Sequence, residues 1–414
     1  MNLNPSQEAA MTALSGNDNV FLTGAAGTGK SFVIRQFMET QYDPVVLATT
    51  GMAAILLSGR TFHSFFCLWN LFAPYDQLVE SAMKNWKMKN RVNRADCIIV
   101  DEVSMLDERT MRAGEEIARK VRGRDEPWGG LRVIAVGDFC QLPPVDPDRK
   151  RGMPVKWVFD TDVWRGSGFV KTELTEIMRT GDTEFMEILN KVRRGVIDEH
   201  VVQFLNDHQK TEQEAEQIDG TRIFARRDEV AAYNARRLAE LDAPLETFDA
   251  EIQKHSFFED SKAADKLIAN MPVDKKLELK RGALVMIRKN NLEAGYANGS
   301  LGHYLSANAN EMIIDLLSGD RVTVEKMVYE QKDGSGSVQA SAAQFPVSLA
   351  WASTIHKVQG ATLDVVIADL GRLWDSGQAY VAMSRTKTAA GFHVLNWSRE
   401  SVIIDNRIKQ FYGF

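Results

Sequence analysis

The stretch Gly24-Ala25-Ala26-Gly27-Thr28-Gly29-Lys30-Ser31 decides the fold of this chain. It matches the phosphate-loop pattern G-x-x-x-x-G-K-[ST] in full. Residues 19–23 before it predict a short buried strand, and residues 31–39 after it have the apolar spacing of a helix. In that order, loop N–H groups and a helix N-terminus point at phosphate oxygens, which argues against a chance Gly-rich turn. All eight residues therefore predict a nucleoside triphosphate site, with Lys30 at the β- and γ-phosphates and Ser31 on Mg²⁺.

The bulk composition is that of an ordinary globular protein. The 414 residues are enough for two or three domains, with 44% apolar and 26% charged residues. A net charge of −6 argues against simple coating of duplex DNA, so a nucleic-acid partner would require positive charge gathered in a groove. The three cysteines form no C-x-x-C pair, and no apolar run approaches the length of a membrane span. We therefore expect a reducing compartment, with no zinc site and no membrane partner.

Acidic and amide side chains follow two predicted buried strands. Residues 97–100 form the first strand, which ends in Asp101 and Glu102. Side chains at the carboxyl end of a strand face the ligand side of an α/β sheet. We expect Asp101 to bind Mg²⁺, directly or through water, and Glu102 to orient the attacking water; solvated acids at a strand end are the alternative. A second strand, over 131–136, leads to Gln141, a candidate γ-phosphate sensor.

Aromatic, basic and hydroxyl side chains gather between the phosphate loop and the strand at 97–100. Residues 59–66 read Gly-Arg-Thr-Phe-His-Ser-Phe-Phe, the ingredients of a single-strand binding surface. A loop with buried phenylalanines explains the same residues equally well. Residues 84–94 place Lys and Arg side chains around Trp86, as expected of either a binding surface or a solvated helix face. We interpret residues from about 65 to 94 as a small insertion in the first domain.

The second half of the chain predicts another α/β unit with an insertion of short strands. Residues 281–330 alternate short strands with turn signals such as Asn298-Gly299-Ser300, which indicates a small β-barrel. A helix over 379–386 brings Arg385 to its end. The predicted strands of the α/β unit itself cover 221–225, 345–351, 365–368 and 391–395.

At this point the motifs resemble those of superfamily-one helicases of the B type, most closely the PIF (petite integration frequency) family. The resemblance spans nearly the whole chain, from Gln7 to Arg385. Its most discriminating run is Val-Asp-Glu-Val-Ser-Met-Leu-Asp at 100–107, followed by Gly-Asp-Phe-Cys-Gln-Leu-Pro-Pro-Val at 137–145. The intervening helix departs from the family pattern at residues 110–114, where the family has a bulkier aromatic and acidic helix. RecD-like and phage helicases are therefore the alternatives within the B type.

The resemblance implies a role for each matching residue. The cofactors would be ATP and Mg²⁺. Gln7 would read adenine, since its amide can both donate and accept, although a solvated first-turn glutamine is the simpler interpretation of that residue alone. The hydrolytic site would comprise Lys30, Ser31, Asp101, Glu102 and Gln141, with Gly360 beside the nucleotide and Arg179 and Arg385 as arginine fingers. The residues that grip one DNA strand would be Thr49, Thr61, His63, Ser64, Thr354 and His356.

The resemblance also implies the fold, an α/β chain with two RecA-like parallel-sheet P-loop domains. The first domain would cover residues 1–180, with the insertion at about 65–94 as a strand-separating wedge. The second would cover residues 181–280 and 346–414, with an SH3-like β-barrel insertion at 281–345. ATP between the two α/β units would close a gap and slide one DNA grip relative to the other.

The activity that this reading predicts is ATP-dependent unwinding of DNA. The resemblance implies 5′→3′ translocation on single-stranded DNA, with fork or partial-duplex DNA as the substrate. A single-strand translocase or RNA helicase would use the same residues, and a non-unwinding P-loop ATPase switch is a further alternative. We expect a monomer in solution and a cytoplasmic location, on the nucleoid if the source is a bacterium or a phage.

Overall fold

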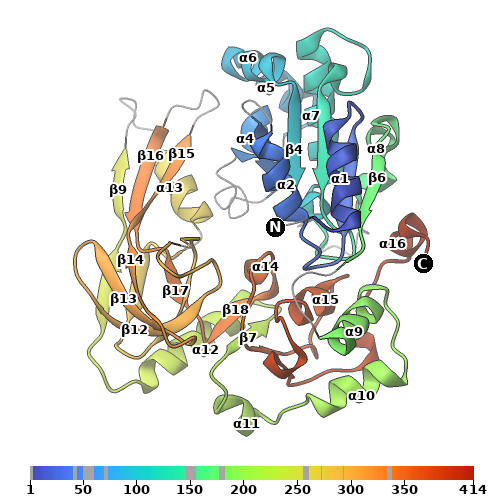
Figure 1. Ribbon diagram of the computed structural model, residues 1–414. Helices are drawn as coiled ribbons and strands as arrows, with labels where there is room; N and C mark the ends of the chain where they lie inside the picture. Colours follow the sequence, from blue (N-terminus) through green and yellow to red (C-terminus); the bar gives the residue numbers. More distant parts are fainter. Residues whose placement is uncertain are drawn as a thin grey trace. The chain divides into compact units, whose positions relative to one another are not determined.

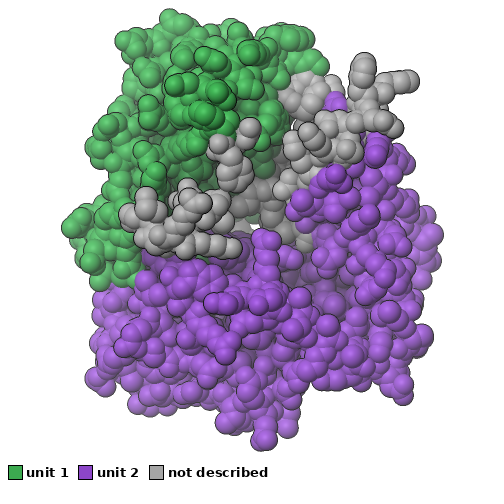
Figure 2. Space-filling model, turned by 180° about the vertical axis from the view of Figure 1, so that it is seen from behind, with its two compact units in different colours: residues 1–181, 334–336, 404–414 green, residues 182–333, 337–403 purple. Residues whose placement is uncertain are grey.

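The computed structural model describes the chain as two compact units (Figures 1 and 2). It describes residues 3–40, 44–49, 60–69, 73–144, 155–176, 182–254, 261–271, 273–291, 293–332 and 338–414. Within these residues, the first unit comprises those up to 176 together with 404–414, and the second comprises those from 182 to 403. None of the described helices is both long and apolar enough to cross a membrane.

The first unit is built on a six-stranded sheet in which every neighbouring pair is parallel, in the order β3-β2-β4-β5-β1-β6. Its strands are β1 (Val20–Gly24), β2 (Val45–Ala48), β3 (Arg60–Thr61), β4 (Cys97–Asp101), β5 (Arg132–Val136) and β6 (Val170–Leu174). Its helices are α1 (Pro5–Ser15), α2 (Lys30–Glu39), α4 (Phe62–Phe66), α5 (Tyr75–Met83), α6 (Trp86–Arg94), α7 (Glu108–Arg122), α8 (Asp162–Gly166) and α16 (Asn406–Tyr412).

Alternation along β1 determines what packs on each face of this sheet. Val20 and Leu22 belong to a core cluster with apolar side chains of α1 and α2. Phe21 points to the opposite face, because successive strand residues alternate. Its ring lies 5.1 Å from that of Trp164 and 5.9 Å from that of Phe411 in α16. Both faces of the strand that leads to the phosphate loop are therefore covered, which fixes the place where the loop begins.

The second unit contains a smaller parallel sheet in the order β18-β7-β19-β20. Its strands are β7 (Thr221–Phe224), β18 (Ala352–Thr354), β19 (Val366–Ala368) and β20 (Phe392–Val394). The helices of the unit are α9 (Thr183–Arg193), α10 (Glu199–Asp207), α11 (Glu212–Glu216), α12 (Arg227–Glu240), α13 (Ser261–Asn270), α14 (Ile355–Val358) and α15 (Gln378–Met383). A parallel sheet with intervening helices is the α/β architecture that the sequence predicts for this half.

Antiparallel strands separate β7 from β18 in the sequence. The largest group is a five-stranded sheet in the order β14-β13-β12-β11-β17. It comprises β11 (Leu284–Ile287), β12 (Leu301–Ala307), β13 (Glu311–Leu316), β14 (Arg321–Glu325) and β17 (Val347–Leu349). Two smaller sheets add β8 (Glu246–Asp249), β9 (Glu251–Lys254), β10 (Lys276–Leu279), β15 (Met327–Lys332) and β16 (Val338–Gln344). The β-rich region therefore begins at Glu246, upstream of the expected boundary at 281. It also includes β17, which lies in the stretch 345–351 that was expected to be a strand of the α/β unit.

The bounds of the first unit differ from the expectation. Residues 404–414 were expected in the second domain, but α16 packs within the first unit. The signals for this helix are local: Asp405 caps its N-terminus and Gly413 ends it with a left-handed backbone. Asn4 caps α1, because its side chain accepts from the Gln7 N–H at 2.9 Å.

Candidate functional site

The phosphate loop joins β1 to α2 through left-handed glycines. Gly27 and Gly29 have φ angles of 83° and 91°, which a side chain would disfavour. The Lys30 ammonium group donates to the carbonyl oxygens of Gly24 at 2.7 Å and Ala25 at 3.0 Å. The loop therefore wraps around the lysine that the sequence assigns to the β- and γ-phosphates.

The remaining loop residues have distinct environments. Thr28 is buried, and its hydroxyl donates to the Ala25 carbonyl oxygen at 3.0 Å, which closes the loop on itself. Ser31 lies exposed in the first turn of α2, where a hydroxyl can reach a ligand. Ala26, which precedes both residues in the loop, is half-buried. The hydroxyl of Thr28 thus supports the loop, whereas that of Ser31 is accessible for metal binding.

Gln7 contacts the loop from α1. It is only 2% exposed, so it is not the solvated first-turn glutamine of the simpler interpretation. Its Oε1 atom accepts from the Asn4 N–H at 3.2 Å, and its Nε2 atom donates to the Thr28 carbonyl oxygen at 3.4 Å. One amide therefore both caps α1 and touches the phosphate loop, which places it where a base could be read.

Asp101 and Glu102 stand at the carboxyl end of β4. Glu102 has φ 53° and ψ 43°, a left-handed conformation that costs about 1–2 kcal/mol for a residue with a side chain. Its N–H donates to Asp101 Oδ1 at 2.9 Å, and its carbonyl oxygen accepts from the Thr49 hydroxyl at 3.1 Å. Backbone strain held at two points is characteristic of functional sites. Here it fixes the direction in which the Glu102 carboxylate leaves the sheet.

Burial, with the charge of Glu102 second, raises the pKa of Asp101 well above its ordinary value, whereas Lys30 opposes this rise. A neighbouring cation stabilises the charged form of a carboxylate that burial disfavours. Asp101, with the accessible hydroxyl of Ser31, therefore fits an oxygen-ligated cation such as Mg²⁺, which prefers one or two carboxylates and keeps several waters.

Gln141 follows β5 in a tight turn. Its side chain is buried, and its N–H donates to the Asp138 carbonyl oxygen at 2.9 Å. The Asp138 carboxylate accepts from the Cys140 N–H at 3.1 Å, so the same residue organises the turn twice. Strands β4, β5 and β1 are neighbours and parallel, so Asp101, Gln141 and the phosphate loop emerge at one edge of one sheet.

Three of the four predicted strand-binding residues of the first unit, Thr61, His63 and Ser64, lie at the start of α4, whereas Thr49 follows β2. Thr61 caps this helix, and its hydroxyl accepts from the Ser64 N–H at 3.1 Å. His63 Nε2 lies 3.4 Å from the Thr110 hydroxyl. Burial lowers the pKa of His63, and the Asp107 charge opposes this shift, so the ring is neutral at pH 7. His63 therefore offers a hydrogen bond or a ring face rather than a positive charge.

Arg91 shows that the basic run of α6 is not a uniform solvated face. Its guanidinium donates to the carbonyl oxygens of Ser64, at 2.8 Å, and Phe65. Trp86, at the start of the same helix, is 67% exposed. Arg91 thus stabilises α4 by bonding its carbonyl oxygens, while Trp86 remains at the surface.

Thr354 and His356 of the second unit lie at the start of α14. Thr354 caps α14 by accepting from the Lys357 N–H at 3.2 Å. Burial lowers the pKa of His356, with Asp375 opposing and Arg227 adding to the shift, so this ring is also neutral at pH 7.

A cavity of about 350 Å³ opens beside Thr354 within the second unit. Its lining carries four cationic side chains, Arg227, Lys276, Arg288 and Lys357, against two acidic ones, Asp274 and Glu278, of which Glu278 pairs with Lys276. Arg288 is buried, and its Nε atom has no hydrogen-bond partner among the described residues. Burial lowers the pKa of Arg288 to about 10. Buried guanidinium groups are normally paired. The lining therefore suits an anionic group such as a backbone phosphate.

Arg385 is 2% exposed within the second unit. The arginine at the end of the helix predicted over 379–386 therefore does not reach solvent. Its guanidinium donates to two oxygens of α15 and its C-cap, the Val381 carbonyl (2.7 Å) and the Ser384 hydroxyl (2.8 Å). It also donates to the carbonyl oxygens of Val358 (3.4 Å) and Ala361 (3.3 Å), which flank Gly360 (φ 76°). Arg385 and Gly360 thus belong to one local structure. The other predicted finger, Arg179, lies outside the described residues.

Comparison with known proteins identifies the family. A family model described as PIF1-like helicase matches residues 2–203. The ATP-dependent DNA helicase Pif1 of Bdellovibrio bacteriovorus is 40% identical across 99% of this chain and 91% of that protein. The chain belongs to the PIF1-like helicase family. The resemblance read from the sequence is thereby confirmed.

Solved PIF1-like helicases have the same fold. Pif1 of Bacteroides sp. in complex with ADP-AlF4 is 28% identical, with a TM-score of 0.85, and the match covers 100% of this chain and 97% of that one. Pif1 from Bacteroides in complex with ADP-AlF3 and single-stranded DNA gives a TM-score of 0.71 at the same identity and coverage. The fold prediction, an α/β chain with two RecA-like parallel-sheet domains, is confirmed.

Two side chains of this PIF1-like helicase reach the site region without having been predicted. Asp138 organises the Gln141 turn, and Tyr412 of α16 contacts both Asp138 and Thr23. The sequence shows Asp138 as an acidic residue shortly after a predicted buried strand. No sequence signal indicated Tyr412, because its partners lie far upstream, 274 positions in the case of Asp138 and 389 in the case of Thr23.

Proposed function

We propose that this chain is an ATP-dependent DNA helicase that translocates 5′→3′ on single-stranded DNA. The observation that carries the proposal is the meeting of three motifs at one sheet edge: the phosphate loop after β1, Asp101–Glu102 after β4, and Gln141 after β5. This is the arrangement that phosphate-loop ATPases use to bind and hydrolyse a nucleoside triphosphate. Membership of the PIF1-like helicase family supports DNA as the polymer that the energy of ATP hydrolysis unwinds.

The hydrolytic roles follow from the local structure. Loop N–H groups bind the phosphates, and Lys30 exchanges its loop carbonyl partners for phosphate oxygens. Glu102, with its backbone held on both sides, orients the attacking water. Gln141 responds to the γ-phosphate, and Gln7 reads the base. Ser31 and Asp101 hold Mg²⁺, which neutralises charge that develops on the phosphates.

The arginine fingers complete this site in the proposal. Arg179 and Arg385 act on the γ-phosphate bound at the loop, and Gly360 lies beside the nucleotide. An arginine of this kind contributes about 10³–10⁵ in rate in related phosphate-loop enzymes. Arg385 would first have to leave the four oxygens it contacts in its own unit. Its release would therefore be coupled to nucleotide binding.

Two sets of residues grip the DNA strand. Thr49, Thr61, His63 and Ser64 belong to the first unit, and Thr354 and His356 to the second. The cationic cavity beside Thr354 would accept a backbone phosphate. The insertion at about 65–94, with exposed Trp86, acts as the wedge, and residues 281–345 form the SH3-like insertion. Breaking one base-pair step costs about 1.4 kcal/mol, so a small wedge suffices.

A strand-displacement assay tests the proposal. We expect the protein to unwind a partial duplex with a 5′ single-stranded tail and to leave one with only a 3′ tail intact. Unwinding from the 3′ tail alone would contradict the polarity and leave the ATPase assignment standing. An RNA substrate unwound faster than DNA would favour an RNA helicase, and ATPase activity without any unwinding would favour a switch.

We further propose that the protein works as a monomer in the cytoplasm, on the nucleoid if its source is a bacterium or a phage. The support for the compartment is that the three cysteines, Cys67, Cys97 and Cys140, are free thiols in the structure. Sedimentation of the purified protein tests the monomer, and cell fractionation tests the location.

A further inference from the structure

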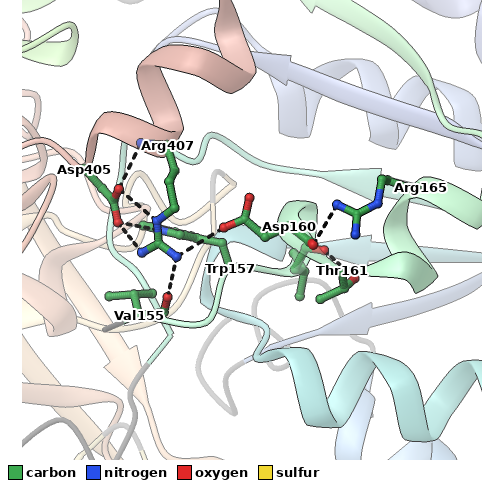
Figure 3. A network of polar contacts seen from close by, with 8 residues as sticks. Val155, Trp157, Asp160, Thr161, Arg165, Asp405 and Arg407 are labelled. Carbon is green, nitrogen blue, oxygen red and sulfur yellow. Dashed lines mark hydrogen bonds and ion pairs between the residues drawn. The ribbon is translucent and has the colours of Figure 1, made fainter. Parts of the chain in front are cut away.

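The C-terminal residues return to the first unit through a polar network (Figure 3). Arg407 donates to Asp405 at 2.5 Å and 3.1 Å, to the Val155 carbonyl oxygen at 2.9 Å and to Asp160 at 3.2 Å. Trp157 donates to Asp405 from its indole nitrogen at 2.9 Å. These bonds fix the start of α16 against the segment that follows the Gln141 turn.

Aromatic packing fixes the end of α16. The ring of Phe411 stacks on Phe159 at 4.6 Å and meets Phe139 edge-on at 5.3 Å. Phe139 lies between Asp138 and Gln141 in the sequence and is fully buried. The helix is therefore packed against the turn that positions the proposed γ-phosphate sensor.

The next residue, Tyr412, carries the polar part of this contact. Its hydroxyl lies 2.9 Å from Thr23 Oγ1, 3.1 Å from the Phe139 backbone nitrogen and 3.3 Å from Asp138 Oδ1. The Phe139 N–H can only donate and a carboxylate only accepts. The phenol therefore accepts from Phe139 and Thr23 and donates its single proton to Asp138. All three bonds are compatible with one hydroxyl group.

These partners join two parts of the proposed site. Thr23 immediately precedes Gly24, the first residue of the phosphate loop, and it is fully buried. Asp138 and Phe139 begin the turn that ends at Gln141. The Tyr412 hydroxyl thus connects the end of β1 with the segment after β5, in addition to the sheet bonds between them.

We propose that Tyr412 is a positioning residue for ATP hydrolysis, which sets the place of Gln141 relative to the phosphate loop. The inference rests on the proposed function, because it assigns Tyr412 to the same site. Nucleotide binding depends on the loop N–H groups, whereas the three bonds of the Tyr412 hydroxyl described above go to Thr23, Phe139 and Asp138. Hydrolysis depends on how Gln141 and the loop lie relative to each other. Loss of the hydroxyl therefore affects kcat more than KM for ATP.

The test is the Tyr412→Phe variant, which keeps the ring and removes the hydroxyl. With saturating single-stranded DNA, we expect kcat to fall about five- to tenfold, the worth of a hydrogen bond or two, with KM for ATP within about twofold. Because the ring packing remains, we expect the melting temperature to change by no more than about 2–4 °C. A kcat within twofold of the parent's overturns the inference.

A double-mutant cycle shows whether the hydroxyl acts through its partner. Thr23→Val removes one of the three bonds of the hydroxyl, so the double variant should be little worse than Tyr412→Phe alone. Effects on kcat that simply multiply contradict a shared role. Tyr304→Phe is the matched control, since its hydroxyl bonds Glu246 in the second unit at 2.9 Å. An equal loss of kcat in that variant also overturns the inference.

Two further variants separate positioning from structural support and from the proposed function. Arg407→Ala breaks the network of Figure 3 and leaves the Tyr412 hydroxyl unchanged. If it lowers kcat as much as Tyr412→Phe at an equal loss of melting temperature, Tyr412 merely holds α16 in place and the inference fails. Lys30→Ala reports on the proposed function itself. If hydrolysis does not depend on Lys30, both the function and the inference fall.

Discussion

A Cβ atom on residue 29 would lie 2.8 Å from the Nε2 atom of Gln7, so the glycine of the phosphate loop leaves the space that the glutamine occupies. The same glycine has φ 91°. The backbone conformation therefore requires glycine at this position, and a side chain there would in addition displace the amide end of Gln7.

Gly29→Ala should lower the free energy of unfolding of the first unit by about 1–3 kcal/mol and weaken ATP binding. Urea unfolding and nucleotide titration measure the two effects. Gly123→Ala is the matched control: its φ is 64°, but a Cβ there would meet nothing within 4 Å. Equal losses of stability in the two variants would mean that the contact with Gln7 contributes nothing.

Lys30→Ala should lower kcat by about 10²–10³ or more, because the ammonium group acts on charge that develops at the phosphates. Stability should change little, since Lys30 contacts only loop carbonyl oxygens in the bonds described above. Steady-state ATPase with saturating single-stranded DNA is the measurement. Lys120→Ala, at an exposed ion pair with Glu116, is the control. Turnover of Lys30→Ala within tenfold of the parent's would contradict the assignment.

The half-buried ring of His63 should make stability fall in acid. Its pKa is lowered in the folded state, so the unfolded chain binds the proton more tightly. The stability that the neutral ring contributes is complete above the ordinary histidine pKa of 6.5. It is lost as the pH falls from there toward the lowered pKa of the folded state. Urea unfolding from pH 8 to pH 5.5 should show a smaller decline for His63→Gln than for the parent. Identical declines would mean that His63 is not buried in solution.

Arg385→Ala should lower kcat by orders of magnitude while ATP still binds at the loop. The structure adds a second effect, because a guanidinium with four oxygen partners also supports the Gly360 turn. Arg385→Lys should rescue kcat poorly, since an ammonium group lacks the planar fork. Arg222→Ala removes another buried arginine of this unit, paired with Glu212, and should lower stability but not kcat of the folded protein. Full ATPase activity of Arg385→Ala would rule out Arg385 as an arginine finger.

Trp86→Ala should slow strand separation and leave single-stranded-DNA-stimulated ATPase within about twofold. The ring is mostly exposed and packs little of the core, so its loss should cost under about 0.5 kcal/mol of stability. Strand displacement and ATPase measured on the same preparation separate the two activities. Equal unwinding by the variant and the parent would place the wedge elsewhere.

Much of the architecture could be predicted because the decisive signals are local. The spacing of Gly24 to Ser31, the acids after β4 and the turns between short strands each depend on neighbouring residues alone. Buried parallel strands are nearly continuous apolar runs, so β1, β4 and β5 were recognisable. The family resemblance then supplied the order of the motifs and the roles of residues such as Gln7 and Arg385.

The sequence by itself determined the phosphate loop, the acids that follow β4 and the family of this chain, because each is written in consecutive residues. Only the tertiary structure decided that Arg385 is buried in its own unit, that Gln7 touches the loop, and that Tyr412 lies 2.9 Å from Thr23. Those facts depend on chain folding across tens to hundreds of residues. Hydrophobic packing and hydrogen-bond satisfaction of the whole unit determine them, and no local pattern encodes either one.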